Sequence, residues 1–381
     1  MHAAASRRMS RAVDTASLVR ALAVTITPVA LHATTGDPNW LLVVLASISL
    51  LIGIERAGLA PLGVLAQAVA IHAGFLLLSL SWTWKPAFVM GCAALAAAAV
   101  ALSLAGSRLR SLGNFVFIPS LYLACEMSQA RANTWALVPY LTVSALPPLA
   151  LSCADALRDE GGHLRLLIRW RKPTDLGAPS GRADTACAII AVTMSVALAA
   201  TLVAWRRLPY GQWAIWSAAS VVTVDAGLAK AKLRDRGIGV LIGVPAGLVA
   251  GLLLFRCTLA YSLLALVTPV TLIAFRHYTT GFAVRCACIA CASWVTQQSL
   301  AAATDRIVDV ILGGVVGVAC VIAMDRAAHP PRQAVNGRRV NATRLPADDD
   351  GSRMLKRPCQ VPGADTGHAR PRAPASRRSS R

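Results

Sequence analysis

Two arginines lie inside long apolar segments of the sequence, where a charged side chain is costly. Arg20 lies within "TASLVRALAVTITPVALHA" and Arg285 within "GFAVRCACIACASWV". An ionisable residue inside a segment of membrane-spanning length is a candidate functional residue. A guanidinium group binds a carboxylate through charge-assisted, often bidentate hydrogen bonds, so both arginines are candidate binding residues for an organic anion. Snorkelling of Arg20 to the membrane surface and pairing of Arg285 with a helix carbonyl are the structural alternatives.

Residues 208–243 contain three further candidate binding residues. Trp213 and Trp216 are three residues apart and share one helix face, where an aromatic ring can stack on them. Arg236 ends a group of four basic residues and begins the pattern R-x-x-G-x-x-x-G. Anchoring at the membrane interface is the alternative for the tryptophans, and a cytoplasmic loop is the alternative for the basic group.

Ionisable side chains in or beside the apolar segments are candidates for proton coupling, because desolvation or a neighbouring charge shifts a pKa there. These candidates are Asp309, Asp225, Glu126 and His72. A structural salt bridge is the alternative for the two aspartates.

Other chemistry is not indicated. Cys286, Cys288 and Cys291 resemble a metal-binding group, but 100° per residue places the first two on opposite faces of a helix, and no adjacent histidine completes a tetrahedral set. The sequence has no G-x-x-x-x-G-K-[ST] motif. We therefore expect no metal, no cofactor and no enzymatic activity.

The elements that carry these residues are predicted to be membrane helices. The mean hydropathy is +0.56 and only 15% of the residues are charged. Apolar segments of about 18 residues recur without period-two alternation, which is typical of helices that cross a bilayer. We predict an all-α, polytopic membrane protein with about twelve spans: 17–34, 39–54, 58–80, 86–106, 112–128, 134–153, 184–204, 210–225, 237–255, 258–275, 279–297 and 307–324.

The positions of the 38 Lys and Arg residues predict the orientation. Most lie in alternate loops and in the C-terminal tail, which places both termini in the cytoplasm; Arg306 is assigned to an outer loop. The high net charge does not indicate nucleic-acid binding, because no folded basic domain is present. An N-terminal signal peptide is the alternative for the first span. The predicted organisation is a cytoplasmic head (1–16), a six-helix half (17–153), a linker (154–183), a second six-helix half (184–325) and a basic, disordered tail (326–381).

Both halves begin and end inside, which predicts two parallel repeats related by an axis along the membrane normal. We expect the eighth span to continue about two turns into the cytoplasm through "AGLAKAKLRDR". Small residues at four-residue intervals predict close helix packing in the second half. These packing positions are Gly239, Gly243, Gly247, Gly251, Gly313 and Gly317.

Three stretches of the second half together resemble a known group of proteins. They are "LPYGQWAIWSAASVVTVD", "RDRGIGVLIG" and "DRIVDVILGG", the last with the pattern R-x-x-D-x-x-x-G. In this order they resemble the fusaric acid resistance (FUSC) and aromatic acid exporter family of bacterial inner-membrane proteins, best over residues 185–325. The linker is shorter than the large cytoplasmic region that many members carry.

The resemblance implies export of aromatic or other weak organic acids across the inner membrane, driven by the proton gradient and in some members with a periplasmic adaptor. The expected partners are therefore the lipid bilayer, the organic acid, an adaptor and a second copy of the chain. Two alternatives stay open at this point. One is a carrier of the major-facilitator type, which also has twelve spans in parallel halves, and the other is a membrane scaffold or enzyme that transports nothing.

Overall fold

The computed structural model describes residues 14–106, 109–159, 170, 182–208, 210–222, 226–254, 257–297 and 300–328. These residues form an all-helical protein without β-strands in the described part. The predicted all-α class is therefore confirmed. Asp225, nearly all of the predicted head and tail, and most of the predicted linker lie outside the described residues.

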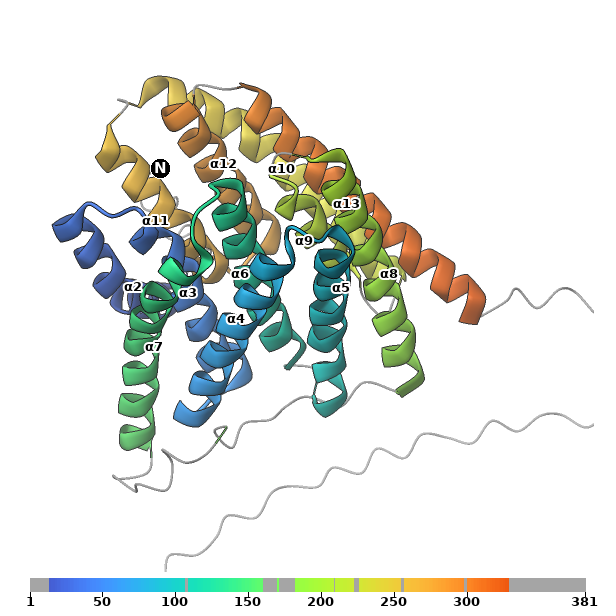
Figure 1. Cartoon of the computed structure of the whole chain (residues 1–381), viewed down its shortest axis with the longest axis horizontal. Helices are drawn as coiled ribbons and strands as arrows, with labels where there is room; N and C mark the ends of the chain where they lie inside the picture. Colours follow the sequence, from blue (N-terminus) through green and yellow to red (C-terminus); the bar gives the residue numbers. More distant parts are fainter. Residues whose placement is uncertain are drawn as a thin grey trace, which may run out of the picture. The chain divides into compact units, whose positions relative to one another are not determined.

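Each predicted span corresponds to one α-helix (Figure 1). Two short 3-10 helices, η1 (Leu102–Ala105) and η2 (Thr134–Leu137), adjoin α5 and α7. The α-helices are α2 (Thr15–Thr35), α3 (Asn39–Ala57), α4 (Pro61–Ser81), α5 (Lys85–Ala101), α6 (Leu109–Gln129), α7 (Val138–Asp159), α8 (Arg182–Arg206), α9 (Gln212–Val221), α10 (Ala226–Leu253), α11 (Thr258–Ala274), α12 (Tyr278–Gln297) and α13 (Leu300–Ala328).

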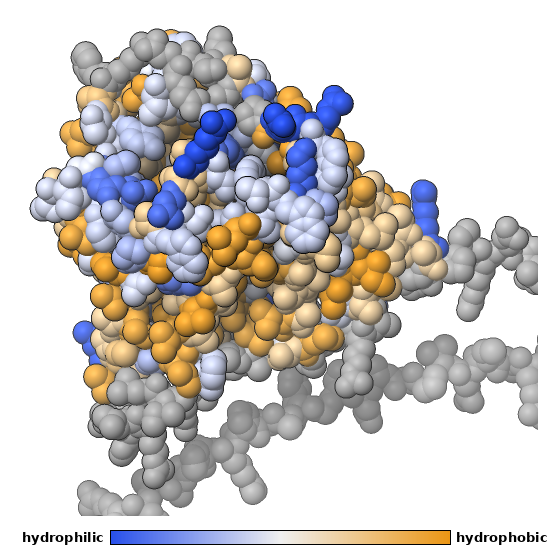
Figure 2. Space-filling view, in the orientation of Figure 1, coloured by the Kyte–Doolittle hydropathy of each residue, from blue (hydrophilic) through white to orange (hydrophobic). Residues whose placement is uncertain are grey.

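Nine of the segments found in the described residues are long and apolar enough to cross a membrane. They contain α2, α3, α4, α5, α7, α8, α10, α12 and α13. Large apolar side chains such as Met90 and Leu253 are exposed, and apolar surface covers much of the face in Figure 2. The chain is therefore a multi-pass membrane protein. The remaining helices, α6, α9 and α11, are shorter or less apolar than these nine, so the twelve spans remain a prediction.

Several helix boundaries differ from the prediction, and three of them concern the segments that carry site residues. Residues 226–236 begin α10 and do not prolong the preceding helix, which ends at Val221. The lysines, arginines and leucines of this stretch are good helix formers, but the helix that they form continues into the glycine-rich segment and is separate from α9. At the other end of the chain, α13 begins at Leu300, so Arg306 is inside a helix and buried. The assignment of Arg306 to an outer loop was therefore wrong.

Close backbone approach along two seams holds the second half of the chain together. On α10, a Cβ at Gly243 would lie 2.2 Å from Ala283 O of α12, and one at Gly247 would lie 2.1 Å from Ala287 O. A Cβ at Gly313 of α13 would lie 2.0 Å from Ala214 O of α9. Only glycine permits such distances, and the helices gain van der Waals contact along both seams.

The helix contacts repeat along the chain. Within α2–α7, the contacting pairs include α2–α3, α2–α7, α3–α7, α4–α6, α4–α7 and α5–α6. The pairs found six helices later, α8–α9, α8–α13, α9–α13, α10–α12, α10–α13 and α11–α12, are also in contact. Two further contacts, α5–α8 and α2–α11, join the two sets of six helices and are related by the same shift.

Candidate functional site

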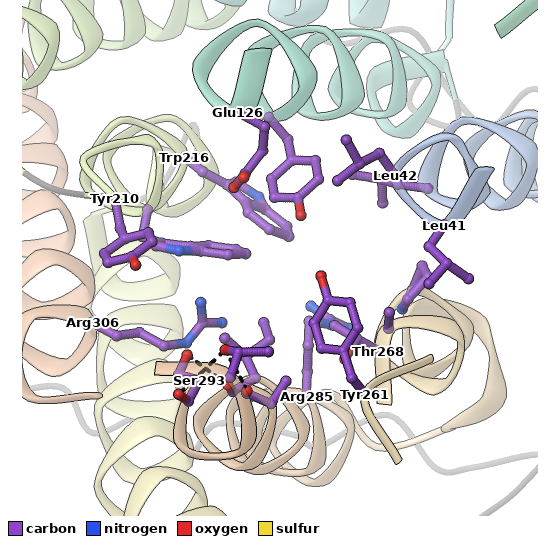
Figure 3. Close-up of a pocket in the computed structure, with 18 of the residues that line it drawn as sticks. Leu41, Leu42, Glu126, Tyr210, Trp216, Tyr261, Thr268, Arg285, Ser293 and Arg306 are labelled. Atoms are coloured by element: carbon purple, nitrogen blue, oxygen red, sulfur yellow. Dashed lines mark hydrogen bonds between the residues drawn. The ribbon is translucent and has the colours of Figure 1, made fainter. Parts of the chain in front are cut away.

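A cavity of about 220 Å³ lies between helices from both sets (Figure 3). Leucines of α3, aromatic rings and several polar side chains form its wall. Its lining residues are Leu41, Leu42, Leu45, Tyr122, Glu126, Tyr210, Trp213, Trp216, Tyr261, Ala265, Thr268, Pro269, Leu272, Arg285, Ile289, Ala292, Ser293, Thr296 and Arg306. A mainly apolar wall with a few converging polar groups is typical of a small-molecule site.

Arg306 of α13 is the most unusual residue of the cavity. Its side chain is 2% exposed, and Cζ lies 3.7 Å from the centroid of the Trp213 ring. Nη2 lies 3.9 Å from Cys286 Sγ, a weak acceptor, whereas Nε and Nη1 have no hydrogen-bond partner among the described residues. A buried guanidinium with two free donors is costly, and an oxyanion in the cavity would satisfy both donors.

Arg285 of α12 provides a second buried cation at the cavity. Its Nε donates to Thr271 Oγ1 at 3.1 Å, and Nη2 donates to the Thr271 carbonyl oxygen at 3.4 Å. The predicted alternative of pairing with a helix carbonyl therefore occurs, yet the residue still lines the cavity. Its Cζ lies 6.0 Å from the Trp216 ring centroid. Thr271 thus fixes one edge of the guanidinium beside the indole.

The short helix α9 places both tryptophans at the cavity. The Trp213 and Trp216 rings are stacked, with centroids 5.3 Å apart and an interplanar angle of 29°. The Ser217 hydroxyl donates to Val310 O of α13 at 2.6 Å, and the glycine seam brings α9 directly against α13. The same contacts therefore set the position of Trp213 against Arg306. Helix α9 also begins beside the cavity, where its N-terminal dipole favours negative charge.

Glu126 of α6 lies on the opposite side of the cavity from Arg306 (Figure 3). Its Oε1 accepts a hydrogen bond of 3.1 Å from Gln212 Nε2. Gln212 Oε1 in turn accepts one of 3.2 Å from Gln129 Nε2. No ion pair joins Glu126 to either cavity arginine in the described structure, where the ion pairs are those of Arg20 and Arg234. The cavity thus holds two cations and one carboxyl group that are not paired with one another.

Other predicted residues lie outside the cavity lining. Arg20 donates to Asp155 Oδ2 at 2.6 Å and lies 3.3 Å from Glu55 Oε1, so it joins α2 to α7 and α3. His72 Nδ1 contacts the Ala68 carbonyl oxygen at 2.8 Å, and Nε2 lies 3.3 Å from Thr142 Oγ1.

Two candidates lie close to the cavity residues without lining the cavity. Asp309 is buried on α13, three residues after Arg306, and its Oδ2 has no hydrogen-bond partner among the residues described. Arg236 is buried on α10. Its guanidinium donates a hydrogen bond to the Tyr278 hydroxyl oxygen and lies over the Phe282 ring. Both candidates are therefore connected with the site through neighbouring residues rather than through its wall.

The sequence prediction omitted Arg306 and the three tyrosines from the site. Tyr122, Tyr210 and Tyr261 come from three separate segments that meet only in the folded chain. For Arg306 a signal was present, because the helix formers of "LAAATDRIVD" extend the last helix upstream of its apolar part. The assembled site offers guanidinium groups that can pair with a negative charge, and indole and phenol rings on which a planar group can stack.

A comparison with known protein families agrees with the sequence-level resemblance. Residues 197–320 match a family described as fusaric acid resistance protein-like. The predicted resemblance is confirmed over these residues, which include Trp213, Arg285 and Arg306 but not Glu126. No curated protein and no solved structure matches the chain.

Proposed function

We propose that this chain is a secondary transporter that exports aromatic or other weak organic acids across the bacterial inner membrane, coupled to protons. The observation that carries the proposal is Arg306, stacked on Trp213 with Nε and Nη1 free among the described residues. A carboxylate completes these donors, and its ring fits beside the stacked indoles. The match to a family named for resistance to an acid supports the same conclusion.

Twelve crossings in two parallel halves, with both termini in the cytoplasm, are part of the proposal. The recurrence of the contacting helix pairs after six helices supports such a repeat. The cavity then lies between the halves, because α3 and α6 come from the first and α9, α11, α12 and α13 from the second. Transporters built from repeats bind their substrates at such an interface.

Glu126 is our first candidate for proton coupling, because among the three predicted residues that the structure describes, it is the one that lines the cavity. Its carboxyl group shares the site with the substrate anion. Like charges repel, so the protonation state of Glu126 affects binding of the anion, and by linkage the anion affects binding of the proton. Asp309, one turn from Arg306, is the second candidate.

Equilibrium binding of radiolabelled benzoate to the detergent-purified protein tests the proposal. Unlabelled benzoate should compete, whereas benzamide, its neutral analogue, should compete far more weakly because it has no charge for the guanidinium groups. The substitution Arg306→Gln should weaken binding roughly 10- to 100-fold, since hydrogen bonds to charged groups contribute about 1.5–3 kcal/mol and about 1.4 kcal/mol corresponds to tenfold.

Arg206→Gln is the matched control, because Arg206 is exposed at the end of α8 and lies outside the cavity lining. It should bind benzoate like the unsubstituted protein. Equal binding of benzoate and benzamide, or unchanged binding by Arg306→Gln, would contradict an anion site. In inverted vesicles, a failure of benzoate to move when a pH gradient is imposed would contradict proton-coupled export.

A further inference from the structure

A second group of polar side chains lies beyond the cavity, around Arg236. This arginine is 3% exposed, and its Nη1 donates to Ser220 Oγ at 2.5 Å and to the Tyr278 hydroxyl oxygen at 3.2 Å. The Ser220 hydroxyl donates its own hydrogen to Ser217 O, so it serves to hold the guanidinium. Arg236 Nε has no hydrogen-bond partner in the described part of the chain. The free Nε and the Tyr278 hydroxyl are donors for one further oxyanion.

A series of neighbouring guanidinium groups and rings connects this group to the cavity. The Phe282 ring has Arg236 Cζ at 4.6 Å from its centroid and Arg285 Cζ at 6.0 Å. Arg285 Cζ also lies 6.0 Å from the centroid of the Trp216 ring, and Trp216 stacks on Trp213. The Trp213 ring in turn contacts the guanidinium of Arg306. The three buried arginines are therefore connected in space through aromatic rings. Phe282 is the ring between the Arg236 group and the cavity.

The Arg236 group is accessible from the end of the bundle where α12 begins. Tyr278, the first residue of α12, is 50% exposed. The preceding turns of α10 carry the exposed side chains of Lys230, Lys232 and Arg234. A cluster of exposed cations beside a buried arginine raises the local concentration of anions and directs them toward the site.

We infer that Arg236 and Tyr278 form a second anion-binding station, and that Phe282 separates it from the cavity. A carboxylate entering from this end binds first to Arg236 and then passes the Phe282 ring to reach Arg285 and Arg306. The backbone of α10 leaves room for this ring, because a Cβ at Gly239 would lie 2.7 Å from Phe282 Cδ1. The inference rests on the proposed function in one respect, namely that both stations bind the same carboxylate.

Comparing equilibrium binding with transport distinguishes the two stations. The substitution Arg236→Gln should leave the Kd of the cavity site for benzoate within about twofold, because the cavity lining is intact. It should lower benzoate flux in proteoliposomes about tenfold, the effect of one lost charge-assisted interaction. Arg236→Lys, which keeps the charge, should recover part of the flux. Arg306→Gln should instead weaken the Kd and the flux together.

Three outcomes would contradict the inference of a second anion-binding station. Normal flux in Arg236→Gln would overturn the second station. A loss of benzoate affinity as large as that of Arg306→Gln, in protein that elutes as the unsubstituted chain on size exclusion, would show that Arg236 belongs to the cavity site itself. Absence of benzoate binding by the unsubstituted protein would contradict the proposed function, and both stations with it. Arg206→Gln, with normal Kd and normal flux, is the control.

Discussion

At the scale of single residues, partners distant in sequence decide which candidates reach the cavity. Trp213, Trp216 and Arg285 were chosen from the sequence for separate reasons, and the structure places all three in the lining of the cavity. Arg20 satisfied the same criterion of a charge inside an apolar segment, yet it pairs with Asp155 from α7. Hydropathy and spacing reveal a buried charge, but they do not reveal a partner more than a hundred residues away.

The carboxyl group of Glu126 gives a prediction about coupling. Glu126→Gln should bind benzoate as well as or better than the unsubstituted protein, because a negative charge is removed from an anion site. Its benzoate flux should no longer respond to an imposed pH gradient across inverted vesicles. His72→Asn is the comparison, since His72 lies outside the cavity lining. If His72→Asn loses the response and Glu126→Gln keeps it, the coupling residue is not in the cavity.

The turn between α2 and α3 gives a prediction about pH. The hydrogen bond from the Tyr140 hydroxyl lowers the pKa of Asp37 below its ordinary value of 3.8. A carboxyl group with a lowered pKa in the folded state stabilises the protein above its ordinary pKa, and this contribution is lost as the pH falls through the folded-state value. Tyr140→Phe should therefore lower the Tm near neutral pH, and the difference from the unsubstituted protein should shrink below about pH 3.8. A difference that is constant with pH would mean that Asp37 is not the cause.

At the scale of helices, the sequence located all twelve elements but misplaced several of their boundaries. Apolar length identifies a buried segment, but charged helix formers such as those at 230–236 prolong a helix without adding hydropathy. The prediction also made α9 too long; the helix has ten residues. The hydropathy of an apolar segment does not show at which residue a buried helix ends. The cavity depends on these boundaries, because α9 carries the tryptophans and the early start of α13 carries Arg306.

The α10–α12 seam gives a prediction about stability with an internal control. Gly247→Ala would place a Cβ 2.1 Å from Ala287 O and force the two backbones apart. Overpacking of this kind costs about 1–3 kcal/mol, so the Tm in detergent should fall by several degrees. Gly237→Ala on the same helix meets nothing within 4 Å and should leave the Tm unchanged or slightly raised. Equal Tm values for the two variants would show that the seam does not require glycine.

At the scale of the whole molecule, the number of crossings decides where the chain ends lie. Nine crossings, an odd number, put residues 14 and 328 on opposite sides of the membrane, whereas twelve put them on the same side. The recurrence of contacts after six helices favours twelve, with the short α9 and α11 counted as crossings. The sequence predicted this symmetry only from its loop charges, because contacts between distant helices leave little trace in the sequence.

Topology reporters test this count directly. A reporter fused after Ala328 and one inserted in the 171–181 segment should both report the cytoplasm, and one inserted at Ala132, between α6 and η2, should report the outside. Opposite locations for the first two reporters would contradict two complete six-helix halves. Transport of benzoate by each fusion shows that the reporter has not disturbed the protein.

The two sides of the cavity have separate origins in the chain, and this makes the site suitable for redesign. Both cavity arginines and both tryptophans lie within residues 197–320, whereas Leu41, Leu42 and Leu45 come from α3. The proposed charge-binding groups and the α3 leucines thus come from different parts of the sequence. Trimming the α3 leucines to alanine enlarges the cavity without touching a guanidinium group. If the proposed function holds, we expect that exchanging this one apolar helix face would let the cavity accept larger acids, with its arginines unchanged.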